Sequence, residues 1–265
     1  MNGIRRILII NGKGGCGKST IATNLAVSYC QRGYRTALMD YDSQASSTDW
    51  AELRTQSPDP RANLQVVPMH SRVGMYQTRA FKQQLPADIT RIIIDTPSGA
   101  RERDIDALIK QCDVILIPML SAPLDIRSGS RFIAELLTHR GYRANPRAIG
   151  VVANRLHHDT ASQQKLLHAL ECLNVPCVAN FADSALYGRA AEDGAGITEL
   201  HLHDDASRIE ANKWMQLIDW VEAQPRRAER IPAPPGATTS PTRTSPVRGR
   251  GSVKPADRPQ HRDRS

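Results

Sequence analysis

The sequence feature that most constrains the fold is a glycine-rich loop set between a strand and a helix. The apolar run at residues 7–10 precedes the loop, and a helical pattern at residues 19–30 follows it. The loop reads GKGGCGKST from Gly12 to Thr20 and matches the phosphate-binding pattern G-x-x-x-x-G-K-[ST]. Such a loop directs backbone N–H groups and the N-terminus of the next helix toward phosphate oxygens. The segment therefore predicts a phosphate site at the first strand–helix turn.

Each position of this loop has an expected role. The inner glycines permit positive φ and a close approach of the backbone to phosphate. We expect Lys18 to bridge the β- and γ-phosphates, the Ser19 hydroxyl to ligate Mg²⁺, and Thr20 to reach the α-phosphate. The motif thus predicts a set of ATP-binding residues: Gly12, Gly14, Gly15, Cys16, Gly17, Lys18, Ser19 and Thr20.

Apolar runs and helical patterns alternate along the chain as far as residue 223. Expected strands lie at residues 6–10, 36–40, 64–67, 92–95, 114–118, 148–153 and 176–179, with helical patterns at 104–112, 125–140, 162–173 and 204–221. Because strands rich in Ile, Val and Leu alternate with helices, we expect an α/β fold: a doubly wound, mostly parallel sheet with helices on both faces. On the last helix, the side chains expected to face inward are Ile209, Trp214, Leu217, Ile218 and Val221.

Composition divides the chain into a domain at residues 1–224 and a tail at residues 225–265. The tail holds ten Lys/Arg against three Asp/Glu, a net charge of +7, and eight of the seventeen prolines. The other 224 residues hold 25 against 24, so the basic character belongs to the tail. Without aromatic residues, the tail is expected to be disordered. The chain has no apolar stretch of 18 residues and no C-x-x-C pair, which argues against a membrane span and a zinc site.

Polar side chains follow three further expected strands. Asp40 and Asp42 end the second, Asp95 ends the run Ile92-Ile93-Ile94, and Asn154 ends the strand at 148–153. We assign Asp40 and Asp95 to the metal, with Ser19, and Asp42 to the attacking water. Asn154 is expected to pair with the edge of a base. Taken singly, such residues are more often helix caps or turn formers, and that alternative stays open, most of all for Asn154.

Together these motifs resemble the ParA/MinD family of deviant-Walker ATPases over residues 4–222. The resemblance rests on KGGCGKST, on Asp40-Tyr41-Asp42-Ser43-Gln44 and on Asp95-Thr96-Pro97. It implies ATP and Mg²⁺ as cofactors, hydrolysis of ATP to ADP and phosphate, and a homodimer with ATP sandwiched between subunits. Lys13 matches the signature lysine that reaches the partner's nucleotide, so it joins the ATP-binding and catalytic residues with Lys18 and Asp42. Ser43 and Ala45 depart from the usual residues, which affects only the expected shape of their loop.

Within this family the chain is most similar to the short ParA proteins. It starts at the first strand, so we expect no N-terminal helix-turn-helix, and it shows no terminal amphipathic lipid-binding helix like that of MinD. The matching cysteine of the nitrogenase iron protein is absent between Asp95 and Cys112, and the last tyrosine is Tyr187, which argues against the family's tyrosine kinases. Plasmid-partition ParA proteins and McdA-type carboxysome-positioning proteins remain.

The resemblance implies a cytoplasmic, nucleoid-associated switch that binds DNA nonspecifically and positions or partitions a cargo. A cargo adaptor would stimulate hydrolysis, and no membrane is involved. The resemblance places the DNA contacts near the C-terminal end of the fold, where Arg189, Arg208 and Lys213 are candidates, although ordinary solvated charges explain them equally well. Two alternatives stay open: a MinD-like membrane-surface ATPase, and a metabolic enzyme of the same superfamily.

Overall fold

The computed structural model describes residues 3–57, 64–69, 85–99, 102–157, 160–202 and 204–226. The chain divides into two units, Met1–Arg230 and Ile231–Ser265, and only the first contains described residues. Apart from residues 225 and 226, the tail whose disorder is expected lies outside the described residues.

The described residues contain one seven-stranded sheet in which every pairing is parallel, with the order β3-β2-β4-β1-β5-β6-β7. The strands are β1 (Arg5–Ile9), β2 (Thr36–Asp40), β3 (Leu64–Pro68), β4 (Arg91–Asp95), β5 (Val114–Met119), β6 (Ala148–Leu156) and β7 (Cys177–Ala182). All seven expected strands are confirmed, and β6 extends beyond its expected end. The class is α/β, as predicted, and the sheet is parallel throughout.

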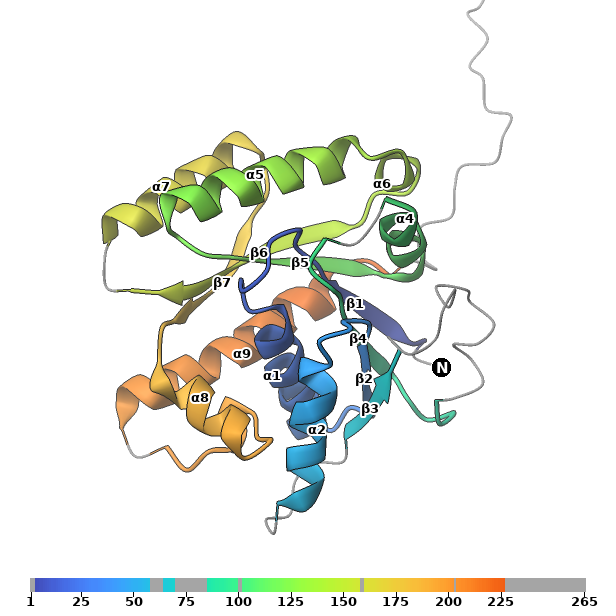
Figure 1. Cartoon of the computed structure of the whole chain (residues 1–265), viewed down its shortest axis with the longest axis vertical. Helices are drawn as coiled ribbons and strands as arrows, with labels where there is room; N and C mark the ends of the chain where they lie inside the picture. The colour runs from blue at the N-terminus through green and yellow to red at the C-terminus, as the bar shows by residue number, and fades with distance from the viewer. Residues whose placement is uncertain are drawn as a thin grey trace, which may run out of the picture. The chain divides into compact units, whose positions relative to one another are not determined.

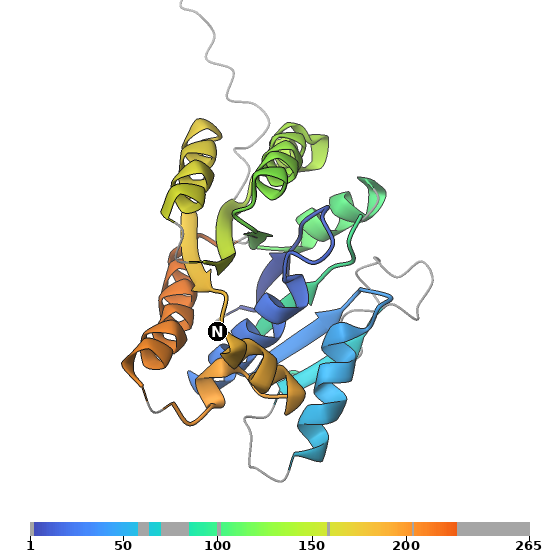
Figure 2. The ribbon, with the colours of Figure 1, turned by 60° about the vertical axis from the view of Figure 1, so that its left-hand side comes forward.

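Helices cover both faces of this sheet (Figures 1 and 2). One layer holds α4 (Glu102–Gln111), α5 (Pro123–Thr138), α6 (Arg140–Ala144) and α7 (Thr160–Cys172). The other holds α1 (Lys18–Gln31), α2 (Ser46–Gln56), α8 (Ala185–Glu192), a 3-10 turn η1 (Ile197–Glu199) and α9 (Asp205–Ala223). Each layer buries its own apolar core against the sheet. On α1, the side chains of Ile21, Leu25, Ala26 and Tyr29 are fully buried.

The position of β1 explains where the phosphate loop lies. β1 pairs with β4 on one side and β5 on the other, and the chain winds outward in opposite directions from it. The crevice beyond the carboxyl ends of strands at such a switch point is where ligands bind in open α/β sheets. The loop after β1, and the carboxylates that end β2 and β4, meet at this edge because Asp40 and Asp95 are register partners.

For one residue of the last helix, the predicted inward position is wrong. Ile209 is 60% exposed, whereas Trp214, Leu217, Ile218 and Val221 are fully buried. Five residues before Trp214, Ile209 is turned by about 140° at 100° per residue, away from the buried stripe. Glu210 takes the inward position instead. Its carboxylate stays buried because Oε1 accepts from the Ala182 N–H and the Tyr187 hydroxyl, both at 2.8 Å.

Candidate nucleotide-binding site

The phosphate loop has the backbone that its glycines predict at two positions. Gly15 has φ of 73° and Gly17, the N-cap of α1, has φ of 93°. A Cβ on Gly17 would lie 2.1 Å from Nδ2 of Asn154, so only glycine fits there. Gly14 lies outside the left-handed region, and a Cβ on it would lie 3.5 Å from Oγ of Ser98, so its close approach to phosphate stays a prediction. The loop delivers the chain directly into α1, whose first turn carries no acidic residue.

Lys18 lies folded across the loop. Its ammonium donates to the Lys13 carbonyl at 3.2 Å and to Oγ of Ser98 at 3.0 Å, and the residue is 5% exposed. Neutral acceptors thus hold a buried cation within the turn, beside the first N–H groups of α1, which have no acceptor within the helix. An anion placed there would meet both the ammonium and the helix terminus, which is the arrangement expected for phosphate binding.

Lys13 is held by its own chain. Its ammonium forms an ion pair with Oδ1 of Asp125, in the first turn of α5, and its N–H donates to Oδ1 of Asn11 at 3.0 Å. The Lys13 side chain is 38% exposed, while that of Asp125 is 12% exposed. The signature lysine is therefore at the surface with its charge partly neutralised by Asp125, a residue to which the sequence analysis gave no role.

The two expected metal carboxylates have different environments. Asp95 is fully buried, and its Oδ2 accepts from the Ser47 hydroxyl at 2.7 Å, whereas its Oδ1 has no hydrogen-bond partner. Burial raises the pKa of Asp95 to about 6, against the opposing effects of the Ser47 and Ser19 hydroxyls. A buried carboxylate oxygen without a donor, beside a serine hydroxyl, fits a hard cation with oxygen ligands. Ser19 and Asp95 are therefore the residues that fit Mg²⁺ here.

Asp40, by contrast, is engaged in holding the next loop. Its Oδ1 accepts from the Asp42 N–H at 3.0 Å, and its Oδ2 accepts from the N–H and hydroxyl of Thr48 at 2.9 and 2.8 Å. The metal role of Asp40 stays a prediction. Asp42 is half-buried and accepts from the Gln44 N–H at 3.0 Å. Ala45, one of the departures from the family pattern, has a left-handed φ of 55° at the N-cap of α2.

Asn154 supports the phosphate loop and borders a cavity beside it. Its Nδ2 donates to the Cys16 carbonyl at 3.0 Å, and the residue is 4% exposed. The cavity has a volume of about 460 Å³ and opens next to Thr20 at the start of α1. Its lining is Thr20, Asn154, Arg155, Asp183, Ser184, Ala185, Tyr187, Gly188 and Ala191. A cavity of this volume beside the phosphate loop suits a base and ribose, and base pairing by Asn154 stays a prediction.

Glu210 lies behind this cavity and holds one of its lining residues, Tyr187, in place. It accepts from the Tyr187 hydroxyl at 2.8 Å and from the Lys213 ammonium at 2.6 Å.

Two residues that line the cavity, Asp183 and Tyr187, were not predicted from the sequence. They follow β7 and open α8, segments without a recognisable motif. Lying one and five residues after the strand, they become candidates only once β7 is known to end beside Asn154.

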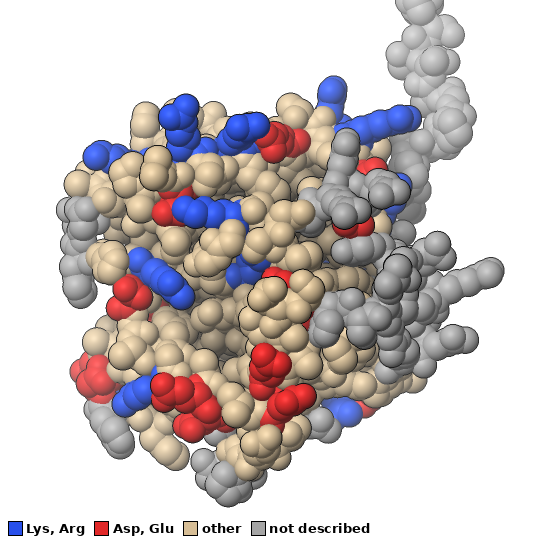
Figure 3. All heavy atoms as spheres, viewed as in Figure 1, with Lys and Arg blue, Asp and Glu red and all other residues tan. Residues whose placement is uncertain are grey.

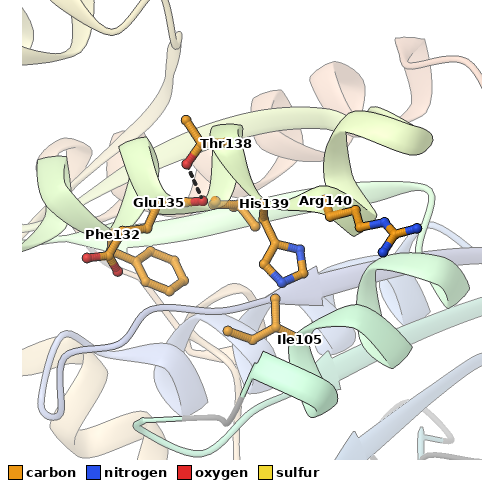
Figure 4. A pocket seen from close by; sticks show the side chains of 7 residues that line it. Ile105, Phe132, Glu135, Thr138, His139 and Arg140 are labelled. Atoms are coloured by element: carbon orange, nitrogen blue, oxygen red, sulfur yellow. Dashed lines mark hydrogen bonds between the residues drawn. The ribbon is translucent and has the colours of Figure 1, made fainter.

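A second cavity of about 460 Å³ lies on the other face, between α4 and the end of α5 (Figure 4). Ile105, Phe132 and Leu136 supply its apolar wall, and the His139 imidazole points toward Ile105. Phe132 also touches the phosphate loop, since a Cβ on Gly12 would lie 3.3 Å from its ring. This cavity therefore lies near the phosphate loop only through Phe132, and it brings together none of the expected site residues.

The three expected DNA contacts lie apart from the phosphate loop, on the α8–α9 side. Arg189 is exposed on α8. Arg208 pairs with Asp205 at 2.9 Å and Lys213 with Glu210 at 2.6 Å, each within the same helix. The structure does not assemble them into one cluster of free charges.

The comparisons with known proteins agree with this geometry. The family model described as the CobQ/CobB/MinD/ParA nucleotide binding domain matches residues 7–194. The protein therefore belongs to this family of nucleotide-binding domains, and the resemblance to ParA and MinD is confirmed. In the described part of the chain, no helix is both long and apolar enough to cross a membrane.

Three individual relatives are similar to this chain over more than half of its length. Maintenance of carboxysome distribution protein A of Halothiobacillus neapolitanus is 27% identical over 209 residues, 78% of this chain and 93% of that protein. Protein virC1 of Rhizobium radiobacter is 31% identical over 172 residues, 62% of this chain and 70% of that protein. A solved ATP complex of a Cyanothece McdA variant superposes with a TM-score of 0.66 at 18% identity, over 85% of this chain and 99% of that one. At that identity the superposition shows the shared fold.

Proposed function

We propose that this chain is an ATP-dependent dimerising switch that binds DNA without sequence preference and positions or partitions a cargo, such as a plasmid or a carboxysome. In this proposal it hydrolyses ATP to ADP and phosphate. An adaptor on the cargo stimulates hydrolysis, and hydrolysis releases the protein from DNA. The protein acts in the cytoplasm, at the nucleoid. The observation that carries the proposal is the position of Lys13, the signature lysine of the phosphate loop. Lys13 lies at the surface, paired with Asp125, the residue that follows the exposed Leu124.

That surface suits a second copy of the chain. Leu124 is 78% exposed at the start of α5, directly before the aspartate that pairs with Lys13. An exposed leucine gains roughly 1.5–3 kcal/mol when it is fully buried, which favours association at this face. Lys13 can exchange a carboxylate of its own chain for phosphate oxygens of a nucleotide in the partner. Because that exchange needs the phosphate, dimerisation would depend on the bound nucleotide.

In the proposed hydrolysis, each of the other site residues has a separate role. The Lys18 ammonium and the N-terminus of α1 neutralise charge on the transferred phosphoryl group, and Lys13 adds a second positive charge from the partner. Asp42 orients the attacking water. Mg²⁺ held by Ser19 and Asp95 would supply neutralisation of phosphate charge. The 27% identity to the carboxysome distribution protein over most of both chains supports the positioning role.

The mass of the protein in solution tests this proposal. The Asp42→Ala variant is incubated with ATP and Mg²⁺ and measured by light scattering, with ADP as the reference nucleotide. We expect twice the 29.3 kDa of the chain with ATP and the monomer mass with ADP. The double variant Asp42→Ala/Lys13→Ala is the matched control and should stay monomeric while still binding ATP. A dimer in that control, or a monomer in the single variant, would contradict the proposal.

A further inference from the structure

Charge is distributed unequally between the two helical layers. Residues 123–172, which include α5, α6 and α7, contain seven Lys/Arg and four Asp/Glu. Residues 183–224, which include α8 and α9, contain three Lys/Arg and nine Asp/Glu. Figure 3 shows the same division: Lys and Arg side chains gather over α5 and α7, and most acidic side chains lie over the opposite half. The folded domain is thus almost neutral as a whole but has one basic face.

The basic side chains of this face are available to a ligand. Arg127, Arg140, Arg143 and Lys165 are exposed, and no carboxylate among the described residues forms an ion pair with any of them. Arg131 pairs with Glu135 four residues later, but both side chains are largely exposed, at 82% and 62%. Such a pair is worth at most about 1 kcal/mol, so Arg131 can exchange Glu135 for another anion. Figure 4 shows the Arg140 guanidinium extending away from the His139 imidazole.

The spacing of these charges suits a linear polyanion. α5 has 16 residues and is therefore about 24 Å long at 1.5 Å per residue. Arg131 lies in the C-terminal half of this helix. α6 follows the end of α5 and carries Arg140 and Arg143, while α7 packs beside α5 and carries Lys165. Cations spread over these helices can follow several consecutive phosphates of one DNA strand, which lie about 3.4 Å apart along the helix axis.

The opposite face differs in its balance of charge. Arg189 is exposed there, and the Arg208–Asp205 pair is as exposed as Arg131–Glu135, whereas Lys213 pairs with the buried Glu210. The difference lies in the nine carboxylates of residues 183–224, which outnumber these three basic residues. A phosphate backbone approaching α8 and α9 would meet net negative charge, which opposes binding. The sequence-predicted DNA contacts therefore lie on the less favourable surface of the domain.

We propose that the C-terminal part of α5, together with α6 and α7, is the surface of the folded domain that contacts the DNA backbone, through Arg131, Arg140, Arg143 and Lys165. Arg127 lies one turn from Leu124, on the part of α5 assigned above to the second copy of the chain, and is left out of this surface. This inference rests on the proposed function, since it assigns a location to the DNA binding proposed there. The contacts are to phosphates, so binding is independent of sequence and steeply dependent on salt. The face is distinct from the α8–α9 residues suggested by the sequence.

Two matched variants of the full chain test the location. The first, Arg131→Gln/Arg143→Gln/Lys165→Gln, removes three positive charges from the α5–α7 face. The second, Arg189→Gln/Arg208→Gln/Lys213→Gln, removes three from the α8–α9 side. Binding to a random-sequence duplex is measured with ATP and Mg²⁺, and with ADP, across a salt series. ATP binding and the ATP-dependent mass are measured in parallel, and both should remain as in the unmodified protein for the first variant.

We expect the first variant to lose at least about ten-fold in affinity near 0.1 M salt, and its salt slope to fall by about two to three. The second should lose clearly less. The reverse order, equal losses in both variants or no loss in either would overturn the inference while leaving the proposed function intact. If the unmodified protein binds no duplex with ATP, the proposed function fails and the inference with it. If the unmodified protein binds polyglutamate through this face but binds no duplex, the partner of the face is an acidic protein and the DNA assignment is wrong.

Discussion

Neutralising Asp95 tests how the metal site is built, because the structure gives this carboxyl an unfavourable environment in the absence of a cation. The pKa of Asp95 is raised by burial from 3.8 to about 6. A carboxyl whose native pKa is raised keeps its proton on the folded chain while the unfolded chain has lost it. Stability therefore falls as pH rises from about 4 to about 6, and the penalty is complete above that range.

The magnitude follows from the shift. About two pKa units correspond to roughly 3 kcal/mol at 1.36 kcal/mol per unit, and about half of this penalty is present at pH 5. The Asp95→Asn variant has no charge to bury at any pH. We therefore expect the variant, without nucleotide or metal, to be more stable than the unmodified protein by about 1–3 kcal/mol at pH 7.5, and by roughly half as much at pH 5.

Urea denaturation in EDTA at the two pH values measures both differences, with equal m-values as the check that the unfolded states are comparable. With Mg²⁺ and ATP at about 100 times their dissociation constant, the unmodified protein should gain about 2.7 kcal/mol at pH 7.5, whereas Asp95→Asn should gain much less. A variant that is less stable than the unmodified protein at pH 7.5 in EDTA would refute the reasoning. A difference that does not change with pH would refute it equally.

Substitutions at three further positions test other parts of the site. Lys18→Ala should abolish binding of a fluorescent ATP analogue while the far-UV circular dichroism stays native; undiminished affinity would remove Lys18 from the site. Asp125→Asn should release Lys13 and shift ATP-dependent dimerisation to lower protein concentration in light scattering, and a shift to higher concentration would show that Asp125 assists the dimer. Glu210→Ala leaves the Tyr187 hydroxyl without its acceptor and should lower the free energy of unfolding by about 2–4 kcal/mol. Glu210→Gln, which retains an acceptor oxygen, should lower it by less than half as much in the same urea titration.

The strands and the phosphate loop were predictable because each leaves a local signal. A buried parallel strand is a short run of Ile, Val and Leu, and the loop needs glycines at fixed positions. Asp95 could be assigned to the expected metal site because it ends such a strand, and parallel strands end at the same edge of a sheet. These inferences need only the neighbours in sequence.

The residues that were missed depend on contacts between distant segments. Asp125 meets Lys13 across 112 positions, and Ser47 meets Asp95 across 48. No pattern in the sequence marks a serine as the donor to a buried carboxylate. The error at Ile209 has the same origin, because an apolar residue was preferred for the buried position that Glu210 occupies. Glu210 is buried because the Ala182 N–H, the Tyr187 hydroxyl and Lys213 satisfy its carboxylate there.

The coupling between hydrolysis and DNA release is the central claim, and one time course tests it most directly. Fluorescence anisotropy of a labelled random-sequence duplex is followed after a limiting amount of ATP is added, for the unmodified protein and for Asp42→Ala. We predict that the unmodified protein binds the duplex and releases it as ADP forms, whereas Asp42→Ala binds and stays bound. Release at the same rate from both proteins, or retention that is indifferent to the nucleotide, would contradict the proposed switch.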